Sequence, residues 1–247
     1  MNKIKKFSRF ILLLEERGSD IAVRTVVRDI INLFKSGLTG IFYLPQDRNT
    51  NFGEYKYFTG ADEENESDED EYDDEYDDED QEISVKYDFP DFPIYFFVKV
   101  KLVQNRRIKR FRIDASAGLF DIDVTITYNP NVDMKPYWNE MSAELNVDVA
   151  HELEHLLQHY HGEFQDETSD YSSNLEYYML PVEIPAQIAG FKRLYDLERK
   201  RGSVVTLDSL VRKWFDSNRY LSKLNSEDEE KIISNILSNF EKKYGYK

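Results

Sequence analysis

The first stretch of the chain has the hydrophobic pattern of helices. Between positions 7 and 34, apolar residues recur every three or four positions, the spacing at which side chains share one face of an α-helix. Gly18 and Ser19 interrupt this pattern, and glycine in particular weakens a helix interior. The sequence therefore predicts two N-terminal helices within residues 1–38, the second of which ends at Gly37.

Residues 39–130 show the alternation of apolar and polar positions that is typical of β-strands. Short strands are expected at 40–45 and 54–60, and longer stretches with the same period lie between 83 and 130. Tight turns are predicted at Asn105-Arg106 and Ala117-Gly118. We interpret the region as a β meander, an antiparallel or mixed twisted sheet with one face on the core and one face in water.

After position 130 the period changes to that of helices. Four helices are predicted, at residues 137–160, 181–201, 207–215 and 227–244. A chain with its strands first and its helices afterwards is typical of the α+β class. We therefore expect one α+β domain in which a sheet region is followed by helices in 131–201 and by further C-terminal helices in 202–247.

The charge of the chain is concentrated in one segment. The sequence has 48 acidic and 32 basic residues and a formal charge of −16. Sixteen of the acids lie between Asp62 and Glu82, where there is no Lys or Arg, so the rest of the chain carries 32 acids and 32 bases. Such a segment repels itself and lacks apolar residues, which predicts a disordered acidic insert at 61–82 within the sheet region.

Composition also excludes several kinds of function. The 247 residues include no cysteine, which excludes disulfides, zinc ribbons, thiolate nucleophiles and iron–sulfur clusters. The acidic balance argues against nucleic acid or anionic membrane as a partner. The apolar run at 10–14 is too short for a signal peptide, and no stretch is long enough to span a bilayer, so a cytoplasmic protein is expected.

All four histidines fall between positions 151 and 161. His151 and His155 are one helical turn apart, so both imidazoles project from the same face and can reach a common ion. Glu152 lies between them in the pattern H-E-x-x-H, where it flanks the ion as a general base. A plain surface helix with scattered polar residues is the alternative, but the helix is apolar around much of its circumference, which favours a buried metal site.

A catalytic zinc site needs three protein ligands, and two residues compete for the third position. Glu183 is expected in the first turn of the helix that begins near Pro181, and the small Ala186 one turn later would let that helix lie close to the first. His161 is the rival, at the spacing of H-E-x-x-H-x-x-G-x-x-H proteins. That geometry favours a glycine at the position of Gln158, so Glu183 is preferred; a site without a third protein ligand is the remaining alternative.

The segment HELEHLLQ, followed by the pattern Y-x-x-x-P-x-E-I-x-A, resembles the gluzincin branch of the zincin metallopeptidases, and most of all small zincin-like proteins of bacteriophages and other viruses. The resemblance covers residues 148–187. It implies a twisted sheet packed on the H-E-x-x-H helix and an edge strand that pairs with extended peptide. It also implies one zinc ion per chain, bound by three residues, with a nearby carboxylate as general base. The implied ligands are His151, His155 and Glu183, the implied base is Glu152, and an oxyanion would be stabilised by Tyr177 or Tyr178.

The expected function is therefore that of a zinc-dependent metallopeptidase that acts on a protein or peptide substrate, in the cytoplasm of a host cell or in a virion. Two other functions stay open. The chain could be a catalytically silent protein of zincin fold with a structural or interaction role, or an acidic decoy that captures a basic protein through residues 62–82.

Overall fold

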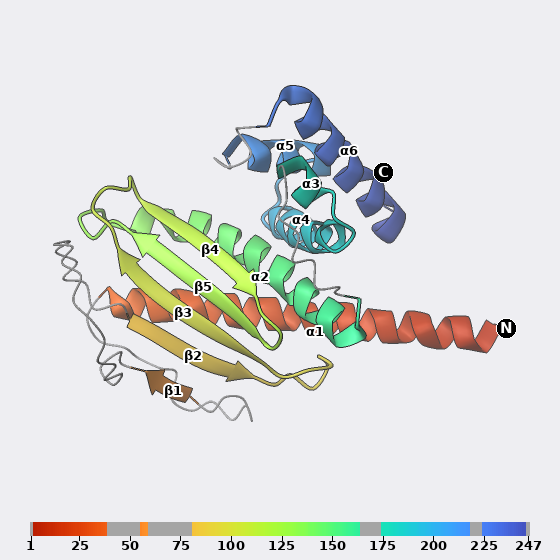
Figure 1. Ribbon diagram of the computed structural model, residues 1–247, viewed down its shortest axis with the longest axis horizontal. Helices are drawn as coiled ribbons and strands as arrows, with labels where there is room; N and C mark the ends of the chain where they lie inside the picture. The colour runs from red at the N-terminus through yellow and green to blue at the C-terminus, as the bar shows by residue number, and fades with distance from the viewer. Residues whose placement is uncertain (1, 39–54, 59–80, 164–173, 218–223, 246–247) are drawn as a thin grey trace, which may run out of the picture.

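The computed structural model describes residues 2–38, 55–58, 81–163, 174–217 and 224–245 (Figure 1). The chain is of the α+β class, as the sequence predicts. Its helices are α1 Asn2–Gly37, α2 Trp138–His161, α3 Asn174–Tyr178, α4 Glu183–Lys200, α5 Leu207–Ser217 and α6 Ser226–Tyr244, with a 3-10 turn at Lys135–Tyr137. Within the described residues, none of these helices is both long and apolar enough to cross a membrane.

The N-terminal segment forms one helix, α1, and the prediction of two helices is wrong. Gly18 is buried inside α1, where a Cβ atom would lie 2.0 Å from the carbonyl oxygen of Asp91. This position therefore requires glycine because a loop packs directly against the helix, and not because the helix ends there. The small loss of helix propensity, about 1 kcal/mol, does not interrupt a helix that tertiary packing stabilises.

The sheet has five strands in the spatial order β1-β2-β3-β5-β4. The strands are β1 Tyr55–Phe58, β2 Gln81–Tyr87, β3 Phe96–Gln104, β4 Phe111–Ala117 and β5 Asp121–Tyr128. All neighbours are antiparallel except β3 and β5, which are parallel. The sheet is therefore mixed, and the simple meander is wrong because β5 inserts between the two strands that precede it.

Side-chain burial explains why β5 is central and β4 lies at the edge. Ile122, Val124 and Ile126 of β5 are almost completely buried, whereas Ile113 is the one residue of β4 that is buried. A strand that buries only one residue would contribute few apolar contacts in the centre of the sheet, so β4 is better placed at the edge. The predicted turn after Ala117 is present, while the chain between β3 and β4 is a longer connection over 105–110 instead of a tight turn.

Two sequence predictions in the sheet region fall wholly or partly outside the described residues. The strand expected at 40–45 and most of the acidic insert lie outside them. The predicted insert, residues 61–82, overlaps β2, which begins at Gln81 and pairs Glu82 with Phe58 of β1. The last two residues of the predicted insert therefore belong to the sheet.

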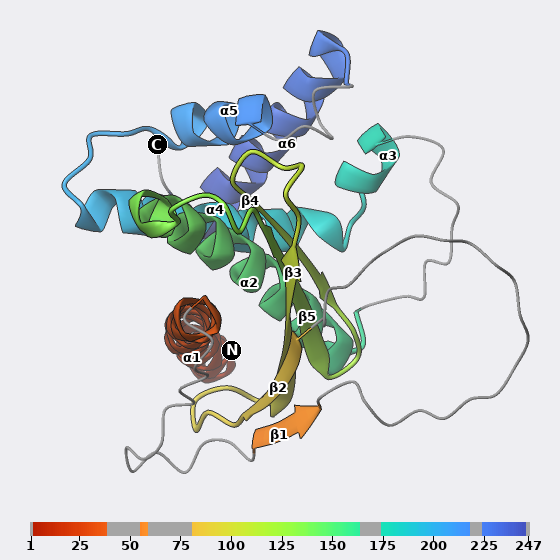
Figure 2. The same ribbon diagram turned by 90° about the vertical axis from the view of Figure 1, so that its left-hand side faces the viewer.

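Helices α1 and α2 cover the same face of the sheet (Figure 2). One hydrophobic cluster fills the space between them and contains apolar residues of α1, of α2 and of the inward face of the strands. A second, smaller cluster joins α4, α5 and α6. Helix α4 packs along α2, so these two helices form the contact between the clusters.

Candidate metal centre

Helix α2 carries the H-E-x-x-H residues in a largely buried part of the fold. His155 and Glu152 are buried, and His151 is partly exposed. The helix continues through Gln158 and ends at Gly162, which adopts the left-handed conformation and donates its N–H to carbonyls of the last turn. His161 therefore stays on the helix, where it is exposed, and does not turn back toward His151 as the alternative ligand set requires.

Helix α4 brings the carboxylate. Glu183 is in the first turn of α4, directly after the cap residue Val182. Ala186 is fully buried, and a Cβ atom on Gly190 would lie 3.0 Å from the carbonyl oxygen of Val147 in α2. Small residues one turn apart thus allow α4 to approach α2 closely, which is the role that the sequence suggests for Ala186.

A buried polar contact also connects α2 and α4 at a point farther from Glu183. Arg193 of α4 donates from Nε to Asn146 Oδ1 of α2 at 2.8 Å and forms an ion pair with Asp20 of α1. Arg193 is 6 % exposed, so its charge requires such partners. Three helices are therefore connected by one side chain, ten residues along α4 from Glu183.

Three potential ligand atoms converge between α2 and α4. His151 Nε2 and His155 Nε2 lie 3.0 Å apart, and the carboxylate oxygens of Glu183 lie 3.3 Å from the first and 3.4 Å from the second. One ligand atom from each residue lies within 4.8 Å of the others. Glu183 Oε2 is buried yet forms no hydrogen bond of good geometry with any residue that the structure describes. This cluster of His151, His155 and Glu183 could bind a metal ion.

The electrostatics of the cluster suit a cation. Burial alone would raise the pKa of Glu183, but interactions with His151 and His155 outweigh it and lower the pKa to about 2. Burial alone would lower the pKa of His155, whereas its contacts with Glu183 and Gln158 raise it above the ordinary value. The carboxylate and the imidazoles thus stabilise positive charge at their centre, which is what a divalent ion supplies.

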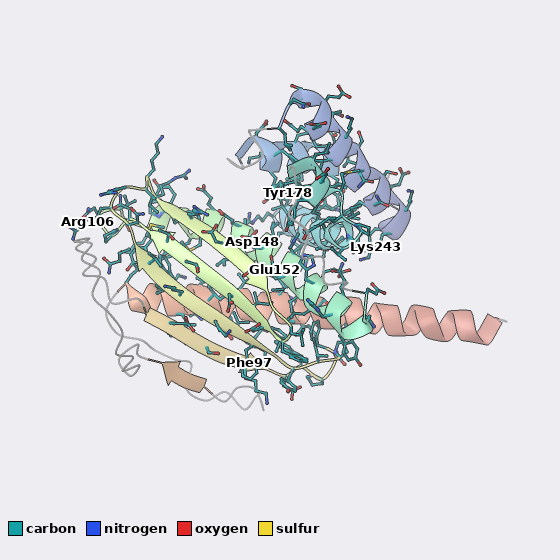
Figure 3. All side chains as sticks on the ribbon, viewed as in Figure 1. Phe97, Arg106, Asp148, Glu152, Tyr178 and Lys243 are labelled. Carbon is teal, nitrogen blue, oxygen red and sulfur yellow. The ribbon has the colours of Figure 1, made fainter. Side chains whose placement is uncertain are left out.

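Glu152 lies next to this cluster and is held by the edge strand. Its carboxylate accepts a hydrogen bond from the backbone N–H of Ala117, the last residue of β4. Burial raises the pKa of Glu152 above its ordinary value, although the neighbouring histidines and this hydrogen bond oppose the shift. Figure 3 shows that Glu152 leaves α2 on the side where β4 and the C-terminal helices face each other.

Two more acids precede Glu152 on the same face of α2, at intervals of one turn. Burial and the charge of nearby Glu140 raise the pKa of Glu144 to about 7. Burial and the charge of Glu144 also raise the pKa of Asp148 well above its ordinary value. Asp114 of β4 adds negative charge to both, so the side of α2 along β4 is strongly acidic.

The two tyrosines proposed for oxyanion stabilisation have different surroundings. The hydroxyl of Tyr177 contacts Glu183, and burial together with this carboxylate raises the pKa of Tyr177. The ring of Tyr178 packs against Phe215 of α5, with ring centroids 6.4 Å apart, as part of the second hydrophobic cluster. Tyr177 is therefore at the metal cluster, and Tyr178 faces the C-terminal helices.

No family model matches the sequence, and neither a curated protein nor a solved structure matches it. The chemistry open to this chain is therefore inferred from the residues of the site and their geometry.

Sequence reasoning missed two residues that contact the site. Gln158 hydrogen-bonds His155, and the backbone of Ala117 hydrogen-bonds Glu152. The position of Gln158, three residues after His155 on the same helix, was a usable signal for the first contact. The second contact depends on which strand lies at the edge, and the strand pattern does not contain that information.

Proposed function

We propose that this chain is a zinc-dependent metallopeptidase, with His151, His155 and Glu183 as zinc ligands and Glu152 as general base. The observation that carries the proposal is the convergence of two imidazoles and a carboxylate from separate helices beside a second, buried carboxylate. A structural zinc is ordinarily held by four protein ligands. The group found among the described residues contains three, which supports a site with one open position.

The spacing and chemistry of the ligands support zinc. Ligands bound tetrahedrally at about 2.0–2.1 Å lie about 3.3 Å from one another. The separations of 3.0, 3.3 and 3.4 Å are close to that value. Imidazole nitrogens suit zinc and its transition-metal neighbours, whereas calcium and magnesium prefer oxygen ligands. The side chain of His151 is 20 % exposed, so solvent has access to the site.

The roles of the residues follow from their positions. When bound, zinc supplies a Lewis acid that polarises a carbonyl and lowers the pKa of water. Glu152 is placed to accept a proton from that water on its carboxylate and to deliver it to the leaving amine. The N–H of Ala117 holds the Glu152 carboxylate beside the metal ligands, so the base does not turn away from the reacting atoms.

The edge of the sheet supports a peptide substrate. Gly118 and Arg110 make backbone hydrogen bonds toward β5 and the residue after it, so the even-numbered residues of β4 pair with β5. The N–H and C=O groups of Ile113 and Ala115, and the C=O of Ala117, therefore point away from β5 and have no partner in it, while the N–H of Ala117 donates to Glu152. No described strand lies beyond β4. An extended peptide can pair with these groups and so reach the metal ligands near Ala117.

A purely structural metal site is the second candidate. This candidate is favoured because His151, His155 and Glu183 lie at the contact between the two hydrophobic clusters, where an ion would hold α4 against α2. In that case the protein binds zinc and cleaves nothing.

The decisive test is Glu152→Gln, compared with Glu154→Gln as a matched control two residues along the same helix. Glu154 contacts Lys243 and is outside the metal cluster. We expect Glu152→Gln to keep one zinc per chain and to lose cleavage of an unfolded protein by at least about 100-fold. Glu154→Gln should keep both properties. Zinc analysis and gel-based cleavage assays measure the two outcomes, and full activity of Glu152→Gln would disprove the mechanism.

A further inference from the structure

A buried glutamine connects the two helices that carry the metal cluster. The side chain of Gln158 is 4 % exposed. Its amide oxygen lies 2.9 Å from Nδ1 of His155, and its amide nitrogen donates to the carbonyl oxygen of Val182 at 2.8 Å. Both ends of the amide are therefore used, one on α2 and one at the start of α4.

The second contact settles the orientation of the amide. The carbonyl oxygen of Val182 can only accept a hydrogen bond, so the amide nitrogen of Gln158 must face it. The amide oxygen must then face His155, and because this oxygen can only accept, the proton of the neutral imidazole is on Nδ1. The lone pair of His155 is thereby placed on Nε2, the atom that faces His151 and Glu183.

The same amide also sets the position of the carboxylate. Val182 directly precedes Glu183, and it is 24 residues from Gln158 in the sequence. A hydrogen bond at this point fixes the first turn of α4 relative to α2. One side chain thus controls both the tautomer of one ligand and the approach of another.

We propose that Gln158 is a positioning residue that preorganises the metal site by holding His155 in its metal-binding tautomer and Val182 at a fixed distance from α2. This inference rests on the metal binding in the proposed function and not on peptide cleavage. Partners of metal-bound histidines of this kind commonly change metal affinity by roughly 10- to 100-fold.

The test compares Gln158→Met with Gln158→Glu in the full chain. Methionine has a similar volume but makes neither hydrogen bond, so zinc affinity, measured by chelator competition, should fall by roughly 10- to 100-fold. Glutamate keeps an acceptor for the Nδ1 proton of His155 but cannot donate to the carbonyl oxygen of Val182, so its zinc affinity should fall by less than about 10-fold and by less than that of Gln158→Met. Nitrogen NMR of the metal-free protein, at a pH high enough to keep His155 neutral, should show the Nδ1–H tautomer of His155 in the wild type and its loss in Gln158→Met.

Gln187→Met is the matched control. Gln187 is equally buried, and its amide donates to the carbonyl oxygen of Tyr178 at 3.2 Å. It should lose stability without losing zinc affinity. The proposal is overturned if folded Gln158→Met binds zinc like the wild type, or if Gln158→Glu loses as much affinity as Gln158→Met. If Gln158→Met does not fold, Gln158→Glu alone decides. A protein that binds zinc but cleaves nothing would refute the peptidase and leave this inference standing.

Discussion

Tyr177 and Tyr178 are neighbours in the chain, and the contacts of their side chains separate their roles. Only Tyr177 has its hydroxyl on a metal-ligand candidate, Glu183. We expect Tyr177→Phe to lower kcat by about 10- to 100-fold with KM nearly unchanged, because an oxyanion donor acts mainly in the transition state. Tyr178→Phe should change kcat little. Steady-state kinetics on a peptide substrate measures both, and equal losses in the two variants would contradict this assignment.

Glu144 makes the stability of the protein depend on pH. Burial and nearby acids raise its pKa from 4.5 to about 7, so the folded state binds more protons than the unfolded state between these values. Stability should therefore fall as the pH rises from about 4.5 to 7. Glu144→Gln removes this penalty and should stabilise the fold by roughly 1–3 kcal/mol at pH 8, but hardly at pH 4.

Urea unfolding at several pH values measures the effect of Glu144→Gln, with the exposed Glu163→Gln as control. The control should show no comparable gain at high pH. A gain for Glu144→Gln that is as large at pH 4 as at pH 8 would show that packing, and not ionisation, is responsible.

The candidate ligands could be predicted from the sequence because their geometry is local. The spacing of His151 and His155 places them on one face of any helix, and Pro181 predicts that Glu183 lies near the start of the next helix. The contact between Gln158 and Val182 could not be predicted, because it depends on how closely α4 approaches α2. That approach is set by residues such as Gly190 and Arg193 at other points of the helix contact.

Helix α1 offers a test of the close contact between Gly18 and the loop that contains Asp91. Alanine normally stabilises a helix relative to glycine by about 1 kcal/mol. At position 18 a Cβ atom would meet the carbonyl of Asp91 at 2.0 Å, so Gly18→Ala should instead destabilise the fold by roughly 1–3 kcal/mol. Ser19→Ala, one residue along, should be close to neutral. Urea denaturation compares the two, and a stabilised Gly18→Ala would mean that helix and loop are not in contact.

The alternation of apolar and polar residues predicts which face of each strand is buried, but not the order of the strands in the sheet. Alternation identifies the inward face of β3 and β5 and so predicts the core residues of the sheet. It does not identify neighbours, because a strand has the same alternation in any order of pairing. The polar character of β4 was the available sign of an edge position, since strands buried on both sides need more apolar residues.

For the whole molecule, metal binding should appear as stability. Zinc that binds only the folded state contributes about 2.7 kcal/mol at a concentration of 100 times Kd. For a chain of this size the melting temperature should rise by roughly 5–10 °C. Calorimetry with zinc and with a chelator measures the shift. It should vanish in His151→Ala and be absent with magnesium, and a shift that persists in His151→Ala would place the bound zinc elsewhere.

Phe58 of β1 pairs with Glu82 of β2, so the acidic segment between them starts and finishes at the same place in the sheet. Residues 59–80 contain fifteen carboxylates and no Lys or Arg, so everything else in the chain has a formal charge of −1. The chain leaves the sheet and returns to it at adjacent points of a single ladder. The segment that carries nearly all of the net charge therefore begins and ends at neighbouring positions of the β1–β2 pairing. A change in the length or composition of this segment leaves the register of every strand unaltered.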